Sequence, residues 1–362
     1  MADDTVDLDS IQSALDEQDG GWEAGSTPLL DMSPEKRRLH LGAELPMGER
    51  SWAARERDAK SSLDYGDAAG APQSVDLRKD GYITSVKDQG ACGSCVAFGS
   101  VAAIEGTARV QAKQSSLAID LSEAHLFYCH AAAQNRNCST GWWVDPALDA
   151  CRDLGVVPEA KFPYTAGNQK CAISGSPSAY RIVSYTKLKE APKMKQWLAD
   201  KGPLVACFMV YEDFYAYKSG VYRHVQGKAE GGHCVSIVGY DDTTKSWIAK
   251  NSWGQGWGTK GFFQIAYGEV GIDFEMWGVA VPAKQEEEEE EGTWLNARKI
   301  TGLWADAESG GVSAFIADAG WKRVSDGPTQ SAMVALLATA RTSGALTDLR
   351  VSNDVIQEVY VL

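Results

Sequence analysis

Six consecutive glutamates, Glu286 to Glu291, are the feature that most constrains how this chain can fold. Like charges repel one another, so such a run is typical of a solvated linker and cannot belong to a packed core. The run divides a chain of 362 residues, which is too long for one small domain, so we expect more than one folding unit. We predict an N-terminal arm at residues 1–70, a main domain at 71–282, the acidic linker at 283–292 and a small β-rich domain at 293–362.

The charge distribution excludes some classes of function. The formal net charge is -14, and residues 1–70 carry 7 basic and 16 acidic side chains. Proteins that bind nucleic acid use basic surfaces to displace counterions from phosphates, and this chain has no basic stripe. No apolar run approaches the roughly 20 residues that cross a bilayer. We therefore expect neither a nucleic-acid partner nor a membrane span.

The stretch Gln89-Gly90-Ala91-Cys92-Gly93-Ser94-Cys95 leads into an apolar pattern that is typical of a helix. Cys95 therefore falls in the first turn of that helix. Unsatisfied main-chain N–H groups and the helix dipole favour an anion there, so the thiol is expected to shift toward the nucleophilic thiolate.

A thiolate that cleaves an amide needs an acid to protonate the leaving group, and His233 is the best candidate. It follows Gly231 and Gly232 and begins a strand-like apolar run, where an imidazole can be held rigidly. A satisfied core histidine is the alternative interpretation. The other histidines are expected in the arm, in packing or helix-end positions, or in a polar loop: His40, His125, His130 and His224.

Downstream, Asn251 can accept a hydrogen bond from an imidazole, and Trp253 can exclude water from that bond. With these residues the chain resembles the papain-like cysteine peptidases, whose local signature and distant His and Asn are known features of the family. The resemblance covers residues 75–282. It implies an α+β fold with two lobes, one helical and one a β-barrel, and a cysteine endopeptidase that works through a Cys-His-Asn acyl-enzyme and needs no cofactor or metal.

The resemblance also assigns roles to particular residues. Gln89 matches the glutamine that stabilises the oxyanion together with the Cys95 N–H group. Gly141 matches the glycine whose main chain pairs with an extended polypeptide substrate. Further matches place substrate-binding residues at Trp142, Trp143, Gly232 and Trp253. Val96 departs from the family, which usually has an aromatic residue after the nucleophile.

Cysteine usage bears on the compartment. The resemblance implies the disulfides Cys92–Cys138 and Cys129–Cys171, and hence a secreted protein or another oxidising compartment, although no signal peptide is recognised in this chain. Cys151, Cys207 and Cys234 lie in apolar patterns and are expected to be buried thiols. A redox or zinc pair formed by Cys92 and Cys95 is the weaker alternative, because no second pair of ligands accompanies it.

Specificity is expected from Glu275. Its position places it near the base of the S2 subsite, where a glutamate accepts a basic substrate side chain in the related cathepsin B. A shift of the alignment by one residue would instead place Asp273 or Phe274 there.

The flanking parts suggest regulation and binding. The arm resembles a propeptide, which would make the enzyme a zymogen inhibited by its own arm, with Leu29-Leu30 and Leu45-Pro46-Met47 as candidate anchors; a flexible tail is the alternative.

In the C-terminal part we expect strands at 299–305, 312–316, 321–324, 347–351 and 355–362 and a helix at 330–342. That order weakly resembles OB-fold barrels, including toxin B subunits, which suggests glycan binding or self-association. Two other functions stay open: a non-enzymatic adhesion protein that uses the papain-like body as a scaffold, and a peptide ligase.

Overall fold

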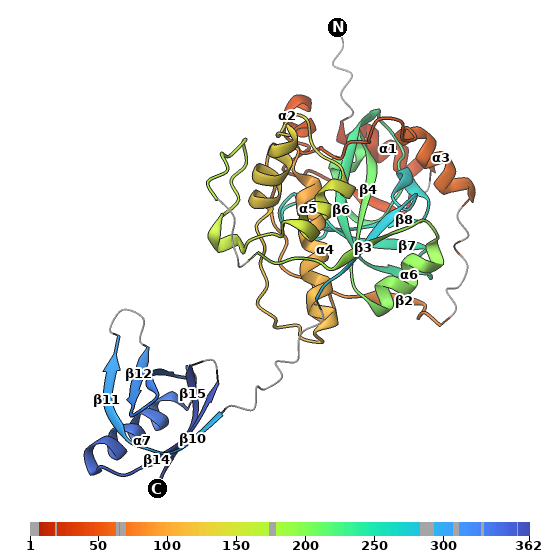
Figure 1. Ribbon diagram of the computed structural model, residues 1–362. Helices are drawn as coiled ribbons and strands as arrows, with labels where there is room; N and C mark the ends of the chain where they lie inside the picture. Colours follow the sequence, from red (N-terminus) through yellow and green to blue (C-terminus); the bar gives the residue numbers. More distant parts are fainter. Residues whose placement is uncertain are drawn as a thin grey trace. The chain divides into compact units, whose positions relative to one another are not determined.

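A computed structural model describes residues 7–18, 20–62, 65, 70–173, 179–282, 293–306, 311–326, 329–352 and 354–362. The chain forms two compact units, Met1–Ala283 and Lys284–Leu362, which are described separately (Figure 1). The predicted acidic linker at 283–292 lies outside the described residues. No helix in the described ranges is long and apolar enough to cross a membrane.

The N-terminal arm is folded onto the first unit. It contains the helices α1 (Leu8–Gln18), α2 (Pro34–Arg38) and α3 (Trp52–Ser62) and the strand β1 (Trp22–Ala24). Ile11, Trp22 and Leu29 are buried and belong to the same apolar core as the large sheet. The alternative of a flexible tail is therefore wrong for the described residues of the arm, because their apolar side chains join the core of the large sheet.

Helices form one half of the first unit. They are α4 (Cys95–Gln111), η1 (His125–Ala131), η2 (Ala132–Gln134), α5 (Val144–Asp153) and η3 (Glu159–Lys161). Helix α4 is apolar on nearly all sides and buried along most of its length, as expected for a central helix. The disulfides Cys92–Cys138 and Cys129–Cys171 are present, and they are the pairs that the resemblance implies.

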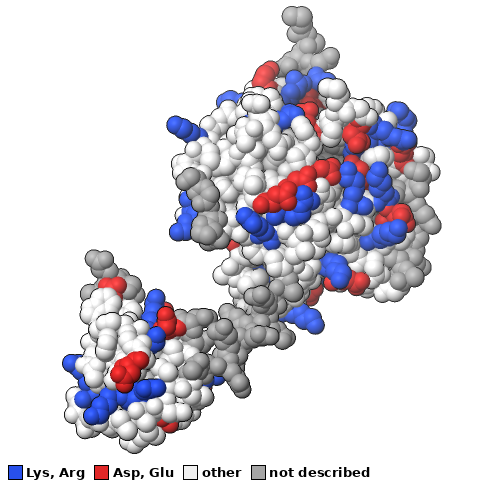
Figure 2. Space-filling view, in the orientation of Figure 1, with Lys and Arg blue, Asp and Glu red and all other residues white. Residues whose placement is uncertain are grey.

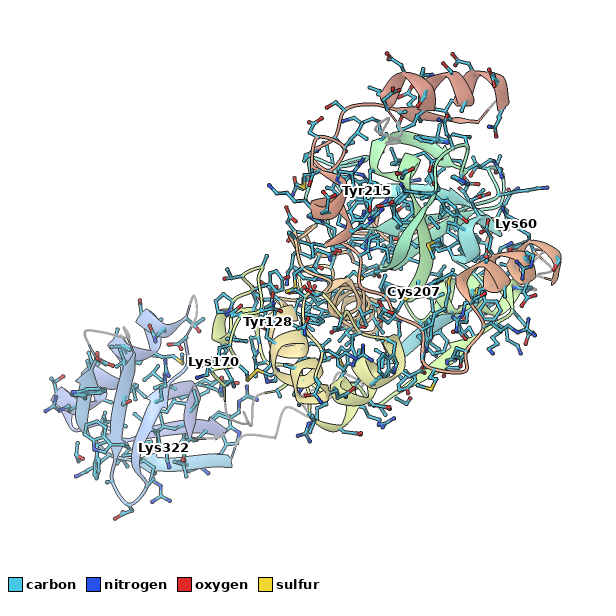
Figure 3. The ribbon with its side chains drawn as sticks, turned by 90° about the horizontal axis from the view of Figure 1, so that it is seen from above. Lys60, Tyr128, Lys170, Cys207, Tyr215 and Lys322 are labelled. Carbon is cyan, nitrogen blue, oxygen red and sulfur yellow. A yellow bond between two sulfur atoms is a disulfide. The ribbon has the colours of Figure 1, made fainter. Side chains whose placement is uncertain are left out.

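A nine-stranded sheet forms the other half. Eight strands follow the order β1-β5-β8-β7-β6-β4-β9-β3, and β2 pairs with β6. The strands are β2 (Ser74–Asp76), β3 (Ser184–Leu188), β4 (Leu204–Tyr211), β5 (Tyr217–Tyr222), β6 (Ala229–Asp241), β7 (Ser246–Lys250), β8 (Phe262–Ala266) and β9 (Met276–Ala280). Helices α6 (Ala191–Asp200), η4 (Glu212–Ala216) and η5 (Glu269–Gly271) connect them. Figure 3 shows Tyr128 on the helical half and Tyr215 and Cys207 on the sheet half.

The second unit is a six-stranded sheet with one helix. Its elements are β10 (Thr293–Arg298), β11 (Ile300–Ala305), β12 (Val312–Ile316), β13 (Gly320–Val324), α7 (Gln330–Ser343), β14 (Thr347–Ser352) and β15 (Val355–Val361). The strand order is β10-β14-β15-β13-β12-β11. The predicted elements occur within one or two residues of their expected bounds, and β10 is a strand that sequence reasoning missed. Helix α7 buries Met333, Leu337 and Ala340 against the sheet, as its periodicity indicates.

Candidate active site

Cys95 is the first residue of α4, with Ser94 at the N-cap position. The loop before it is held by the Cys92–Cys138 disulfide and by a hydrogen bond of 2.9 Å from the Gly93 N–H to the Cys138 carbonyl. The Cys95 side chain is a free thiol and is completely buried. Since Cys92 is in a disulfide, it cannot form the redox or zinc pair with Cys95 that was the alternative interpretation.

His233 and Asn251 meet because β6 and β7 are paired neighbours, with Ser236 opposite Lys250. His233 Nε2 lies 2.7 Å from Asn251 Oδ1. An amide oxygen only accepts hydrogen bonds, so Nε2 carries the hydrogen and Nδ1 keeps a free lone pair. The indole of Trp253 packs on the imidazole with ring centroids 4.6 Å apart. His233 Nδ1 is buried and has no hydrogen-bond partner among the described residues.

The Gln89 side chain has its amide orientation fixed by a neighbour. Ser252 Oγ donates a hydrogen bond of 2.6 Å to Gln89 Oε1. The Gln89 Nε2 group then donates to the carbonyl of Cys92 at 2.8 Å and to that of His40 at 3.0 Å. The donor predicted for an oxyanion is thus occupied by a carbonyl of the arm.

The arm segment around Gly42 passes through the site as an extended strand. The N–H groups of Gly42 and Ala43 donate to the Gly232 carbonyl, each at 3.0 Å. The Trp142 N–H donates to the Gly42 carbonyl and the Glu44 N–H to the Trp142 carbonyl, each at 2.8 Å. Ala43 forms a parallel bridge with Trp142. The arm therefore uses main-chain groups on both sides of the cleft.

Glycine is required where the arm and the loop at Gly141 approach each other. A Cβ atom on Gly42 would collide with the Gly93 main chain, and one on Gly141 would collide with the Gly42 carbonyl. Gly141 also has φ = +55°, a conformation that favours glycine. The close backbone contact explains how the thiol behind it becomes inaccessible.

Burial controls the ionisation of the two reacting groups. It raises the pKa of the Cys95 thiol to about 12, although main-chain N–H groups of Cys234 and Gly42 act in the opposite direction. It also lowers the pKa of His233 to about 3, against the opposing effect of the bond to Asn251. The expectation of a thiolate is wrong for this state, because desolvation by the arm outweighs the helix terminus.

The remaining predicted substrate-binding residues divide into two groups. Gly141 and Gly232 contact the arm through their main chains, as described above. Trp142 is fully buried and its indole donates to Gln134 Oε1 at 3.1 Å, so only its main chain faces the arm. Trp143 is half-buried and lines a pocket whose other walls include Trp52, Arg55 and Glu275.

Glu275 is buried at this pocket and is bound by a side chain of the arm. Its Oε1 atom accepts a hydrogen bond of 2.6 Å from Arg55 Nη1, and both side chains are nearly inaccessible to solvent. The guanidinium also lies 4.8 Å from the centroid of the Phe274 ring. Asp273 points away from the pocket, because it accepts hydrogen bonds from the Trp247 indole and the Gly268 N–H, each at 2.9 Å.

Sequence reasoning missed the arm residues that fill the site: Gly42, Ala43, Trp52 and Arg55. The only available signal was Gly42 itself, and a single glycine is weak. Of the suggested anchors, Leu29 is buried, whereas Met47 is fully exposed. Cys207, expected to be buried, is partly exposed and stands opposite Cys234 in the β4–β6 ladder.

The other histidines have structural partners. The rings of His125 and His130 contact each other at 4.4 Å, and His224 Nδ1 lies 3.1 Å from Asp213 Oδ2. Within the described ranges, no cluster of three or more His, Cys, Asp or Glu side chains could hold a metal ion.

Comparisons with known proteins agree with this geometry. Residues 71–280 match the family described as papain family cysteine protease. The chain is 37% identical over 228 residues to cathepsin B-like CP3 of Giardia intestinalis, covering 58% of this chain and 75% of that protein. It is 32% identical over 279 residues to ananain of Ananas comosus, covering 76% of this chain and 77% of that one.

A solved proform is also similar. The structure of digestive procathepsin L2 proteinase from the larval midgut of Tenebrio molitor superposes with a TM-score of 0.63 and 26% identity, covering 76% of this chain and 89% of that chain. The chain belongs to the papain family and is a papain-like cysteine protease.

Proposed function

We propose that residues 71–282 form a cysteine endopeptidase in which Cys95 is the nucleophile, His233 the acid and base, Asn251 the positioning residue and Gln89 an oxyanion donor. The observation that carries the proposal is the 2.7 Å bond between His233 and Asn251. It leaves one nitrogen of the imidazole available for proton transfer. His233 directly precedes Cys234, whose main-chain N–H acts to lower the pKa of the Cys95 thiol.

The chemistry follows from these groups. Once the arm leaves, a proton moves from the Cys95 thiol to His233 Nδ1, and the thiolate attacks the peptide carbonyl carbon. The Gln89 Nε2 group and the Cys95 N–H stabilise the oxyanion of the tetrahedral intermediate. His233 then gives its proton to the leaving amine, and the acyl-enzyme forms. His233 next removes a proton from water, and the oxygen attacks the thioester carbonyl. The C–S bond then breaks, the carboxylic acid product leaves, and His233 returns the proton to the Cys95 sulfur.

The arm keeps this machinery latent. Its carbonyl at His40 occupies Gln89, and its strand at Gly42 pairs with the main chains of Trp142 and Gly232. A substrate that binds through its main chain needs the same groups. The complete burial of Cys95 supports a zymogen whose arm must be displaced or cleaved before substrate can enter.

The contact between Arg55 and Glu275 supports a subsite that accepts a basic side chain. Lys187 and Lys189 lie 3.9 Å from Glu275 Oε2, so Arg55 is the close partner of this buried carboxylate. Loss of a close partner is costly for a buried charge, so the pocket favours a cation as its occupant. In the latent form the arm supplies that cation, and in the active form an arginine or lysine of the substrate would replace it.

The second unit supports an OB-like barrel. Strands β10 and β11 are separated by Lys299 alone, yet they lie at opposite ends of the strand order. If they are two halves of one bent strand, the sheet closes on itself with no free edge.

The two disulfides of the first unit support a place of action in an oxidising compartment.

The proposal is tested with a thiol-directed epoxide followed by mass mapping. We expect modification at Cys95 after the arm has been cleaved and none in the intact chain. Iodoacetamide labelling of the partly exposed Cys207 in both forms shows that thiol reagents reach the protein. Modification of another residue with Cys95 left unmodified in the trimmed enzyme, or full peptidase activity of a trimmed Cys95→Ser variant, would overturn the assignment.

A further inference from the structure

The exposed aromatic side chains of the described residues all belong to the second unit. They are Trp294, Trp304, Phe315, Trp321 and Tyr360, with exposed fractions between 37% and 56%. In the first unit no described Trp, Tyr or Phe is exposed, although that unit holds most of the aromatic residues. Burying an aromatic ring is strongly favourable, so rings left in water on one small unit indicate a binding surface.

Three of these rings lie on one face of three neighbouring strands. Trp304 is on β11, Phe315 on β12 and Trp321 on β13, and we call them the aromatic platform. Phe315 stands opposite Trp321 in the ladder, and their ring centroids are 5.3 Å apart. Ala314 and Ile316, the neighbours of Phe315, are fully buried on the other face. The platform therefore points outward from the sheet.

Gly302 extends the platform across β11. It is paired with Phe315, and a Cβ atom there would lie 3.0 Å from Phe315 Cβ and 3.2 Å from Trp321 Cη2. The absence of a side chain lets the Trp321 indole lie over the β11 main chain. Phe315 and Trp321 meet edge to face with an interplanar angle of 76°, so the rings do not share one plane, and the half-exposed indoles of Trp304 and Trp321 offer separate apolar faces.

Polar groups accompany the platform without giving it a strong charge. Ser313 stands between Trp304 and Arg323 in the next row of the ladder. The Arg323 guanidinium is paired with Asp326 at 2.9 Å. Residues 293–362 contain six basic and seven acidic side chains, a net charge of -1. Figure 2 shows both signs of charge on the face of this unit that is in view.

This charge balance and the size of the platform limit the possible ligand. A nucleic acid needs a basic groove along its phosphates, and the net charge of -1 on residues 293–362 does not favour such a ligand. Fully covered aromatic side chains bury about 150–250 Å² each, and roughly half of that is exposed here, so the three rings of the platform offer about 225–375 Å². A stable protein interface needs about 800 Å² on each partner. A small ligand whose units each cover one indole face is therefore the better fit.

We infer that the aromatic platform binds a neutral polysaccharide built of β-linked pyranose units. A pyranose with equatorial hydroxyls presents a flat face of C–H groups that can cover an indole, and its hydroxyl groups can bond to Ser313 and Arg323. The inference goes beyond the proposed peptidase activity and does not depend on it. Binding of this kind would hold the protease on glycan-rich material.

The test uses the full chain with Cys95→Ser, which prevents self-cleavage, and measures its retention on microcrystalline cellulose and on chitin. We expect retention on at least one of them, with release by the matching soluble hexasaccharide. Trp304→Ala with Trp321→Ala should weaken binding by about tenfold or more. Trp304→Ala alone is the second variant, because Trp321 also covers Gly302 and its loss can disturb folding.

Trp294→Ala is the matched control, since Trp294 is an exposed indole on β10 that contacts Tyr360 and lies outside the platform. It should bind as the parent chain does. Four results would overturn the inference: no retention on either polysaccharide, equal retention of the platform variants, stronger binding to a single-stranded oligonucleotide, or dimerisation in light scattering that depends on Trp304.

Discussion

Replacing Gly42 by alanine should open the latent enzyme without any cleavage. The Cβ atom of alanine would collide with the Gly93 main chain, which is part of the disulfide-bonded loop before Cys95 and cannot move aside. The arm must therefore leave the cleft, although its helices can stay on the sheet. The variant changes a residue of the arm and leaves every proposed reacting group in place.

The size of the effect follows from the bonds that the segment makes. Four main-chain hydrogen bonds link residues 42–44 to Gly232 and Trp142. Each contributes a net value of about 0.5–1.5 kcal/mol, so their loss costs roughly 4 kcal/mol. At about 1.4 kcal/mol for each factor of ten, the open fraction of the chain should rise about a thousandfold.

The assay is the rate at which an epoxide labels Cys95 in the uncleaved chain, measured by mass spectrometry before any processing occurs. Met47→Ala is the control, because Met47 lies in the same arm and is fully exposed. It should leave the slow rate of the parent chain unchanged. If Gly42→Ala folds normally and its Cys95 is labelled as slowly as in the parent, the arm strand does not close the site and the argument fails.

Three further predictions concern the groups around the cleft. Asn251→Ala should lower kcat/KM of the trimmed enzyme by roughly tenfold to a hundredfold, since the imidazole of His233 loses its orienting bond; peptide hydrolysis measures this. Glu275→Ala should reduce cleavage of an Arg-Arg reporter relative to a Phe-Arg reporter by about tenfold or more in the trimmed enzyme, and an unchanged ratio would contradict the proposed subsite. Acid should favour release of the arm from the cleft in the intact chain. The pKa of His233 is about 3 when the arm covers it and near 6.5 when it is exposed to solvent. Between these pH values the open state binds more protons than the closed state, so lowering the pH stabilises the open state. Hydrogen-exchange protection of residues 40–44, corrected for intrinsic rates, should therefore fall as the pH drops from about 6.5, and constant protection would contradict this.

Local sequence patterns predict much of this fold. The glycine-rich loop and apolar run place Cys95 at the start of α4, and the apolar run that begins at His233 predicts the strand β6. The family resemblance, and not a local pattern, pairs His233 with Asn251, which directly follows β7. The strands and helix of the second unit follow from their periodicity and turns, apart from β10. These elements are predictable because the spacing of apolar residues and the residues at the ends of each element are visible in its own sequence.

Other features depend on contacts that no local pattern encodes. The arm is polar over most of its length, and its path is set by a main-chain contact at Gly42 and a buried ion pair at Arg55. The ionisation of Cys95 also depends on tertiary burial, which reverses the effect expected from the helix terminus. The sequence therefore indicates that Cys95 and His233 can react, but it does not show that the arm around Gly42 covers them.

The most direct test of the latent thiol is a titration of its thiolate by ultraviolet absorbance, taken as the difference between the parent chain and Cys95→Ser. In the intact chain the Cys95 signal should appear only at strongly alkaline pH, because burial raises the pKa of the thiol to about 12. After removal of the arm it should appear below neutral pH and should depend on His233. The same titration curve before and after removal of the arm would contradict this mechanism of latency.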